Sequence, residues 1–556
     1  MKLSAFVLSG IVIAALACGS GSQNRFDGDG GDDAGSIFGN NGDAASDACS
    51  AAAQESSSVG CDYYAIDMDG GWAADNGCFV AFLANTSQAT ARVKASFQGI
   101  DVDLSAHAAI PHGAGKSLTL DPFDPDQGIP AGEVGILFLA GPPTVGSSRN
   151  DGDFNSPVEC PILPAFSTLT QLHGTGKGRA FHLQTTAPVV AYQMLPYGGG
   201  HAAVTGATLL LPTTVFGTNY IATDAYGASA TTGAASTSMD LVAAQDGTTI
   251  TILPNHDILP GGGVPGASTN VPTTYTLNAG ETLQFTQPDE LTGSPIQSDK
   301  PIGLFAGHPC LNVPTGQPFC DHAEQQIPSI QALGHEYMAV TYRQRAESPE
   351  HPPWRIIGAV DGTALTYSVP VGGPSTVNQG DVIEFETGTP FVVKSQDADH
   401  PFLLVGYMTG ASGVTPSSGY GDADFVRTVP TDQYLARYVF FTDPTYPETN
   451  LVVTRKRQNG TFSDVTLDCA GTLGGWQTVD ADHEYTRIDL VRHDFQPQGG
   501  CDNGRHEMSS DAPFGLTVWG WGTPETSDYT GYVSYGYPAG QNVQTLTTVV
   551  VPVQPK

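Results

Sequence analysis

Short apolar runs separated by turn-forming residues recur along the chain from about residue 49 to its end. The runs are four to eight residues long and rich in Val, Ile, Thr, Phe and Tyr, as in TITIL, TLQF and FLLVGYM. Gly, Pro, Asn and Asp lie between them. Such runs predict β-strands, whereas the spacing of amphipathic helices is almost absent. We therefore expect an all-β protein.

Three phrases of the sequence repeat. In the first, a polar stretch and a proline precede an apolar run, and the prolines, 113, 100 and 112 residues apart, are Pro188, Pro301, Pro401 and Pro513. A proline fits an edge strand or the first position of a strand, where no ladder N–H is required. The second phrase begins at Pro212, Pro328 and Pro430. The third has Asp-Gly between apolar runs, at Asp246 and Asp361, which is a hairpin signal.

The recurrence predicts a tandem array of immunoglobulin-like β-sandwich modules, each about 100 residues long. Phe79 to Phe97 is typical of an opening hairpin, and Thr548 to Val553 of a closing strand. One continuous β-domain, such as a propeller, is the alternative. The expected β modules span residues 49–211, 212–327, 328–429 and 430–556.

The amino terminus indicates export. Lys2 and the apolar run from Leu3 to Ala17 have the form of a signal peptide, too short to span a bilayer. Residues 15–18, Ala-Leu-Ala-Cys, resemble a bacterial lipobox. We therefore expect residues 1–17 to be removed and Cys18 to carry a lipid anchor with palmitate among its acyl chains. An ordinary cleaved signal is the alternative. Residues 18–48 are rich in Gly, Asp and Ser and predict a disordered tether.

The charge composition excludes some classes of binding partner. Lys plus Arg total 22 against 56 for Asp plus Glu, a net charge of −34. That charge argues against nucleic acid and against docking on anionic lipid. We expect contact with the membrane through the lipid anchor only. Gly19 follows Cys18, whereas an aspartate there is the familiar signal that retains a lipoprotein in the inner membrane. By that resemblance we expect the protein in the outer membrane and exposed at the cell surface.

Eight cysteines follow Cys18, an even number in an oxidising compartment, which predicts disulfides. We expect Cys310 to pair with Cys320, since the two close a short loop. We also expect Cys469 to pair with Cys501, because both lie in the last module. The remaining four allow three pairings, of which the preferred one joins Cys49 to Cys61 and Cys78 to Cys160.

The stretch HPCLNVP…FCDHAEQQIPS…GHEY, residues 308–337, together with the Asp-Gly turns and the proline phrases, resembles the amino-terminal domain family of the IgG Fc-binding protein. The resemblance covers roughly residues 49–556. The phrase at Val429 departs from it, since it lacks the cysteines and the glycine. The motif residues are His308, Asp321, His322, Glu324, Pro328, Gly334 and Tyr337. The resemblance implies a binding protein, with a protein or glycan as its ligand; immunoglobulin binding itself is not carried over.

Several residue groups suggest chemistry. His308, Asp321, His322 and Glu324 surround a disulfide and offer zinc-ligand types, although such residues also hydrogen-bond backbone in turns. We assign no metal there. The acidic loops 121–128 and 150–155 suit Ca²⁺ or are solvated turns, so Ca²⁺ is the only cofactor considered. Trp519 and Trp521 lie on one side of a strand and suit a sugar-binding face or a core.

No familiar catalytic spacing occurs: the sequence has no Gly-x-Ser-x-Gly, His-Glu-x-x-His or P-loop. We therefore expect no enzyme. Two hypotheses remain. In the first, a non-enzymatic lipoprotein presents the β-sandwich array to bind a protein or glycan in adhesion. In the second, the array is a structural envelope scaffold that associates with itself or with other envelope proteins.

Overall fold

The computed structural model describes residues 43–71, 74–142, 157–230, 236–414, 419–526 and 531–555. The chain from Asp43 onward forms one compact unit. The predicted signal peptide, Cys18, most of the tether and the acidic loop 150–155 lie outside the described residues. In the part of the chain that is described, no helix is long and apolar enough to cross a membrane.

Helix α1 (Asp43–Glu55) begins inside the range assigned to the tether, which moves the start of the ordered chain forward. Its sequence, DAASDACSAAAQE, is rich in alanine, the best helix former. The helix contacts β1 (Val59–Ala65) and β9 (Phe181–Leu195). The disulfide between Cys49 and Cys61 fastens it to β1.

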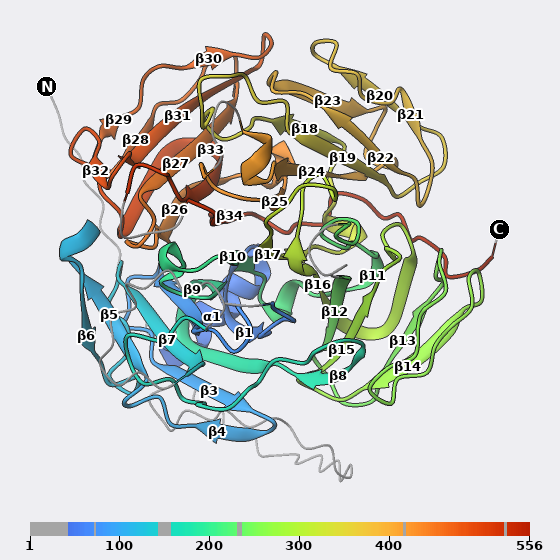
Figure 1. The fold of residues 1–556 in the computed structure, drawn as a ribbon, viewed down its shortest axis with the longest axis horizontal. Coiled ribbons are helices and arrows are strands. Elements are labelled where there is room, and N and C mark those ends of the chain that lie inside the picture. The colour runs from blue at the N-terminus through green and yellow to red at the C-terminus, as the bar shows by residue number, and fades with distance from the viewer. Residues whose placement is uncertain are drawn as a thin grey trace, which may run out of the picture. The chain divides into compact units, whose positions relative to one another are not determined.

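The remaining regular structure is β-sheet, as the sequence predicted, and the strands fall into four modules in chain order (Figure 1). Module 1 is a nine-stranded sheet. It has the order β4 (Ile100–Val102), β3 (Val93–Phe97), β9, β2 (Phe79–Asn85), β7 (Val134–Ala140), β5 (Ala108–His112), β6 (Thr119–Pro122), with β1 and β10 (Gly206–Leu210) also on β9.

Module 2 has eight strands: β14 (Thr273–Leu277), β13 (Thr248–Ile252), β16 (Pro295–Leu311), β12 (Thr237–Ala243), β15 (Glu281–Gln287) and β8 (Gly176–Arg179), with β11 (Gly217–Ile221) and β17 (Asp321–Ile327) on β16. Module 3 has two four-stranded sheets. One is β18 (Glu336–Ala339), β23 (Phe391–Ser395), β20 (Thr363–Tyr367), β21 (Thr376–Val377); the other is β22 (Val382–Glu386), β19 (Pro353–Gly358), β24 (Phe402–Met408), β25 (Asp424–Arg427).

Module 4 is again nine-stranded: β29 (Gly471–Thr472), β28 (Val465–Leu467), β33 (Arg505–Trp521), β27 (Glu448–Lys456), β31 (His483–Arg492) and β30 (Gln477–Thr478), with β26 (Leu435–Phe441) and β34 (Ser534–Pro538) on β33 and β32 (Gln496–Pro497) on β31. Short 3-10 turns accompany the strands, at η1 (Gly115–Ser117), η2 (Gly199–His201), η3 (Thr213–Val215), η4 (Ile330–Ala332), η5 (Ala411–Gly413) and η6 (Thr431–Gln433). The residues just after the second-phrase prolines form η3, η4 and η6.

Three of the four phrase prolines do not open strands, which corrects the expectation for them, whereas Pro401 directly precedes β24 as expected. Pro188, Pro301 and Pro513 lie inside the long strands β9, β16 and β33, where the partner strand shows a register break. A bulge needs no ladder N–H, so proline fits there. The two halves of each long strand then pair with different partners; β9, for example, pairs with β3 before Pro188 and with β2 after it. The long strands thus serve both layers of a sandwich.

The expected hairpins are also corrected. β9 lies between β2 and β3, and β16 lies between β12 and β13, so neither pair forms a hairpin. The Asp-Gly turns instead bond to a second turn. Gly247 N donates to Asn278 Oδ1 at 3.1 Å, and Gly362 N donates to Asn378 Oδ1 at 3.0 Å. The turn chemistry was correct, but the long strand takes partners on both sides.

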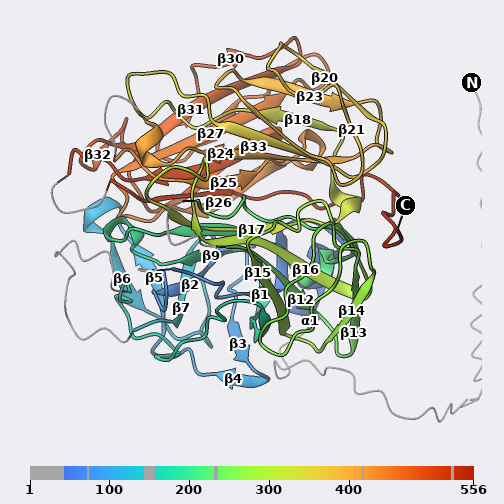
Figure 2. The same ribbon diagram turned by 45° about the vertical axis from the view of Figure 1, so that its right-hand side comes forward.

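Four strands join the modules. β10, β17, β25 and β34 each pair with only one strand of their own module. β10 contacts β17 and β34, and β25 contacts the same two, which closes a cycle. Figure 1 shows these strands at the centre, and Figure 2 shows β17 and β25 along the boundary between modules 1 and 2 and modules 3 and 4. β8, although it precedes β9 in the chain, pairs with β15 of module 2.

The segment after β34 is not a closing strand, which corrects the expectation for Thr548 to Val553. It runs in an extended form along the second phrases of modules 2, 3 and 4 and along Ser58 of module 1 (red in Figure 1). Its hydrogen bonds go to Ser58 in module 1, Gln433 in module 4, Gln331 in module 3 and Asn219 in module 2. We call residues 541–551 the carboxyl-terminal strap.

Candidate functional site

Each module holds one buried tyrosine that hydrogen-bonds to the first phrase, and in modules 2, 3 and 4 this tyrosine belongs to the second phrase. Its hydroxyl donates to the carbonyl of the residue after the phrase proline: Tyr63 to Val189 (2.6 Å), Tyr220 to Ile302 (2.6 Å), Tyr337 to Phe402 (2.5 Å) and Tyr438 to Phe514. In three modules it also accepts the N–H three residues earlier, from Gly217 (2.9 Å), Gly334 (3.0 Å) and Leu435 (3.0 Å). We call this arrangement the tyrosine bracket.

The chain segments just before these tyrosines also pack on the second phrase of another module. A Cβ at Gly60 would lie 2.5 Å from Pro212 Cβ, and one at Gly334 would lie 2.3 Å from Pro430 Cβ. The module 4 phrase, which lacks the glycine, has Leu435 here, and it lies beside Gly540. Gly334 and Tyr337 of the motif therefore hold modules together. Pro328 lies between β17 and η4, in the same phrase.

The acidic and amide residues of the motif lie at the central strands. Asp321, fully buried, accepts backbone N–H groups from Thr205 of module 1 and Ser534 of module 4, the latter at 2.6 Å. Gln325 donates to the carbonyls of Ala207 (3.1 Å) and Gly536 (2.9 Å). These side chains supply hydrogen bonds to strand edges that have no ladder partner.

His308, His322 and Glu324 are likewise fully buried. His308 Nδ1 accepts the N–H of Cys310 at 3.0 Å, and burial lowers the pKa of His308 to about 3. Gln193 donates to Glu324 Oε2 at 2.6 Å, which ties β17 to β9. His322 Nε2 lies 3.8 Å from Glu324 Oε2.

The four motif residues with zinc-ligand chemistry do not converge. Among the described residues, the one group of three His, Cys, Asp or Glu side chains close enough to share an ion is Asp468, Cys469 and His506. Cys469 is bonded to Cys501 and offers no thiolate. In the described loop 121–128, Asp124 Oδ1 accepts the N–H of Asp126 at 2.9 Å, as in an ordinary turn. The structure thus brings no ligand set together at either place.

Burial sets the proton affinity of the central carboxyls. It raises the pKa of Asp422 to about 7, and it raises those of Asp321 and Asp424 well above the usual range. Asp422 Oδ1 accepts the N–H groups of Ala411 and Ala423, both at 2.9 Å, which partly offsets the burial. These groups lie at the centre of the modules and have no exposed face for a ligand.

Four disulfides are present: Cys49–Cys61, Cys78–Cys160, Cys310–Cys320 and Cys469–Cys501. In module 1 the preferred pairing of the three open alternatives is the one formed. Cys310 and Cys320 are buried against the core of module 1, although the loop that they close belongs to β16 and β17. This bridge, like the motif around it, lies at a junction between modules.

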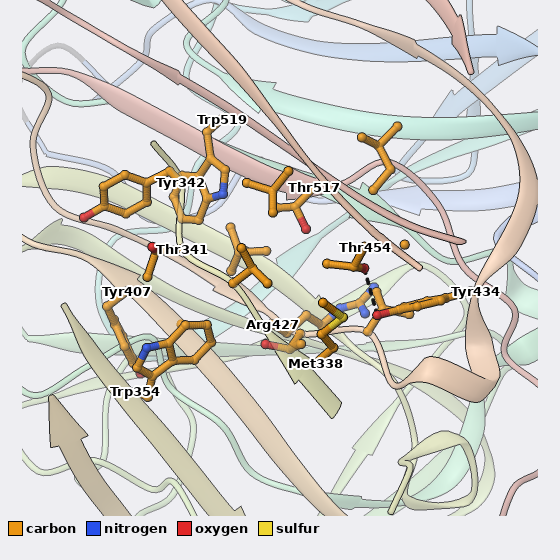
Figure 3. Close-up of a pocket in the computed structure, with 18 residues that line it drawn as sticks. Met338, Thr341, Tyr342, Trp354, Tyr407, Arg427, Tyr434, Thr454, Thr517 and Trp519 are labelled. Atoms are coloured by element: carbon orange, nitrogen blue, oxygen red, sulfur yellow. Dashed lines mark hydrogen bonds between the residues drawn. The ribbon is translucent and has the colours of Figure 1, made fainter. Parts of the chain in front are cut away.

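A cavity of about 50 Å³ lies between modules 3 and 4 (Figure 3). Aromatic side chains surround it, and all are at least nine-tenths buried; they are Tyr342, Trp354, Tyr407, Tyr434 and Trp519. Thr454 donates to the Tyr434 hydroxyl at 2.9 Å. The cavity has room for water but not for a sugar. Trp519 and Trp521 are therefore core residues, since neither exposes a face for stacking.

A larger groove of about 280 Å³ shares Thr341 and Tyr342 with the cavity. Its other lining residues are Gln344, Pro349, Glu350, His351, Pro352, Gly388, Thr389 and Arg487. Gln344, His351 and Thr389 are exposed. We call it the 3/4 groove, because Arg487 belongs to module 4 and the rest to module 3.

The wall of the 3/4 groove is fixed. Glu350 Oε2 accepts from Arg345 Nε at 3.0 Å and Nη2 at 2.8 Å, and from the Tyr342 hydroxyl at 3.0 Å. Arg345 is fully buried and lowers the pKa of Glu350 against the opposing effect of burial. Arg345 also donates to the carbonyls of Thr409 and Tyr420, both at 2.8 Å. The groove is thus preformed.

No sequence signal pointed to the 3/4 groove, because its residues come from loops and from a strand of another module. The motif residues, in contrast, are all buried or internal. The motif residues build the junctions between modules. The 3/4 groove, in contrast, lies at a module boundary and has exposed polar groups.

Antiparallel β-sandwich modules, joined by buried polar strands, define this chain as a multi-module β protein. It belongs to a known family: the model of the IgGFc binding protein family matches residues 206–520, from β10 into β33. That match confirms the family resemblance over a shorter range than residues 49–556. No curated protein matches the sequence.

Proposed function

We propose that this protein is an exported, lipid-anchored protein of the cell surface that binds a protein or glycan in adhesion and catalyses no reaction. Membership of a binding-protein family supports the binding role. The signal-like run and the lipobox around Cys18 support the anchor. By this proposal the outer membrane holds the lipid, and the tether carries the modules away from it.

The preformed 3/4 groove is the observation that carries the binding role. Ligand pockets are usually concave and largely formed before the ligand arrives, and the Arg345–Glu350 pair holds this one open. The groove volume of about 280 Å³ is near the lower end for ligand sites. It suits one residue of a larger ligand, with further contacts on the surface around it.

A glycan array and a surface-protein pull-down with residues 43–556 test the proposal, with IgG Fc among the probes and with calcium or chelator added. We expect a specific, saturable ligand. Silence in every condition, with self-association in the ultracentrifuge, would instead support the envelope scaffold. Dependence on calcium would bring the acidic loops back as ligand contacts.

The anchor has its own test. Metabolic labelling with palmitate should mark the wild-type chain and leave Cys18→Ser unlabelled, and the wild type should fractionate with the outer membrane. Label on Cys18→Ser, or a wild-type chain released to the medium, would contradict the anchor without touching the binding role.

A further inference from the structure

The 3/4 groove contains a cation that no carboxylate neutralises at close range. In a chain of net charge −34, most arginines near the groove are paired. Arg343 binds Glu448 and Asp489, and Arg345 binds Glu350. Arg487 instead donates to two neutral oxygens of one residue: the carbonyl of Thr341 at 2.9 Å and its hydroxyl at 3.3 Å.

Tyr485 and Asp489 are the acidic groups that act on Arg487, Tyr485 the more strongly, and the Asp489 carboxylate is already engaged. Asp489 Oδ1 accepts from Arg343 Nε at 2.9 Å and from Asn450 Nδ2 at 2.9 Å. The Tyr485 ring lies 4.9 Å from the Arg487 guanidinium and supports it by a cation–π contact. The planar fork of Arg487 is thus held in place while its charge remains available at the groove.

Apart from Tyr342, Pro349 and Pro352, the rest of the groove lining is polar, and its one carboxylate is paired. Thr341, Gln344 and Thr389 offer hydroxyl and amide groups, and Glu350 is neutralised by Arg345. Gly388 allows the wall to close, since a Cβ there would lie 2.2 Å from the Glu350 carbonyl oxygen. His351 is exposed at the groove and adds an imidazole whose N–H can donate a hydrogen bond. Hydroxyl and amide groups around one fixed guanidinium match a small polar ligand that carries one carboxylate.

We propose that the 3/4 groove binds a carboxylated sugar residue of a glycan, of the uronic or sialic acid kind, with Arg487 on the carboxylate. This inference rests on the proposed binding function and names its ligand class. A sugar is favoured over an acidic peptide because the lining has hydroxyl and amide groups for ring hydroxyls and lacks a deep apolar pocket for a side-chain anchor. Loops 341–352 and 388–389 line it, and they present no strand edge for an added peptide strand.

The test is calorimetric titration of the full-length chain with oligogalacturonate and sialyllactose, and with the same saccharides after reduction of their carboxylates to alcohols. We expect binding of at least one acidic saccharide and at least tenfold weaker binding of its reduced form. Arg487→Gln should weaken the binding of the acidic saccharide by at least tenfold, and Arg487→Lys should retain part of the affinity that Arg487→Gln loses. Arg92→Gln, which removes an exposed arginine of module 1, is the matched control and should change affinity less than twofold.

If Arg487 had only a structural role, Arg487→Gln would have a lower melting temperature, and its affinity for acidic and for reduced saccharides would fall equally. His351→Gln changes an exposed position, so its folding is not in question. This second variant should also bind the acidic saccharide more weakly. The inference is overturned if the reduced saccharide binds as well as the acidic one, or if Arg487→Gln retains full affinity. Binding of acidic peptides alone, or of a neutral glycan found on the array, also overturns it, while the proposed binding function stands. Silence of all probes overturns both.

Discussion

The tyrosine bracket makes a sharp prediction for Tyr337→Phe. The ring is fully buried, and the substitution keeps it while it removes the hydroxyl. That hydroxyl donates to Phe402 O at 2.5 Å and accepts from Gly334 N at 3.0 Å. Burial raises the pKa of Tyr337, so the hydroxyl is the donor at every ordinary pH.

Removal leaves one buried N–H and one buried C=O without a partner. Each such group costs about 1–3 kcal/mol, whereas a hydrogen bond that water can replace contributes about 1 kcal/mol. We therefore expect Tyr337→Phe to lower the free energy of unfolding by about 2–6 kcal/mol. Tyr367→Phe is the matched control in the same module, because its hydroxyl, which donates to Pro374 O at 2.9 Å, is only half-buried.

Urea unfolding followed by tryptophan fluorescence measures both variants. The control should shift the midpoint little, and Tyr337→Phe should shift it clearly, with an unchanged slope. Equal midpoints for the two variants would refute the bracket as a stabilising element. The three other tyrosines of the bracket should behave as Tyr337 does, since their carbonyl partners occupy the same place after the phrase proline.

Three further outcomes are expected. Cys78→Ser should destabilise by about 2 kcal/mol more than Cys310→Ser, because its bridge spans 82 residues rather than 10; non-reducing urea melts check this, and equal melts would contradict the loop-entropy reasoning. The buried Asp422 carboxyl, with its pKa raised to about 7, contributes stability that is fully present below about pH 4 and lost as the pH rises through about 7. The melting temperature should fall over that range, and Asp422→Asn should flatten the fall. Asn219→Ala removes both hydrogen bonds to the backbone of Val551, at 2.8 and 2.9 Å, so hydrogen exchange of the Val551 amide should accelerate; unchanged exchange would show that the strap is held elsewhere.

The β class and the fourfold recurrence were predictable because both depend on local patterns. Apolar runs of strand length and turn residues report their structure without knowledge of their partners. The disulfides followed from chain separation in the same way. Helix α1 was missed because its residues are small and polar, so they resemble a spacer; its alanine content was the available signal.

Pairing was not predictable, because the long strands collect partners from distant parts of the chain. Pro301 looks like a strand start in sequence, yet it lies within β16, where the register of β11 breaks between Gly217 and Asn219. The Asp-Gly turn at Asp246 forms, but it does not reverse the chain. β12 and β13, which flank it, both run antiparallel to β16, β12 along its second half and β13 along its first. An Asp-Gly pair specifies a turn, and the strand pairing follows from the whole module.

The motif that identified the family suggested ligand chemistry, but the open edges of the central strands give its residues another role. Each of β10, β17, β25 and β34 has a ladder partner on one side, so its other edge presents backbone N–H and C=O groups inside the protein. Water is largely excluded there, and polar side chains must serve in its place. Carboxylate suits facing N–H groups and amide suits facing carbonyls, which is how Asp321 and Gln325 are used. A motif rich in Asp, Glu and Gln is therefore what a junction of four unpaired strand edges requires.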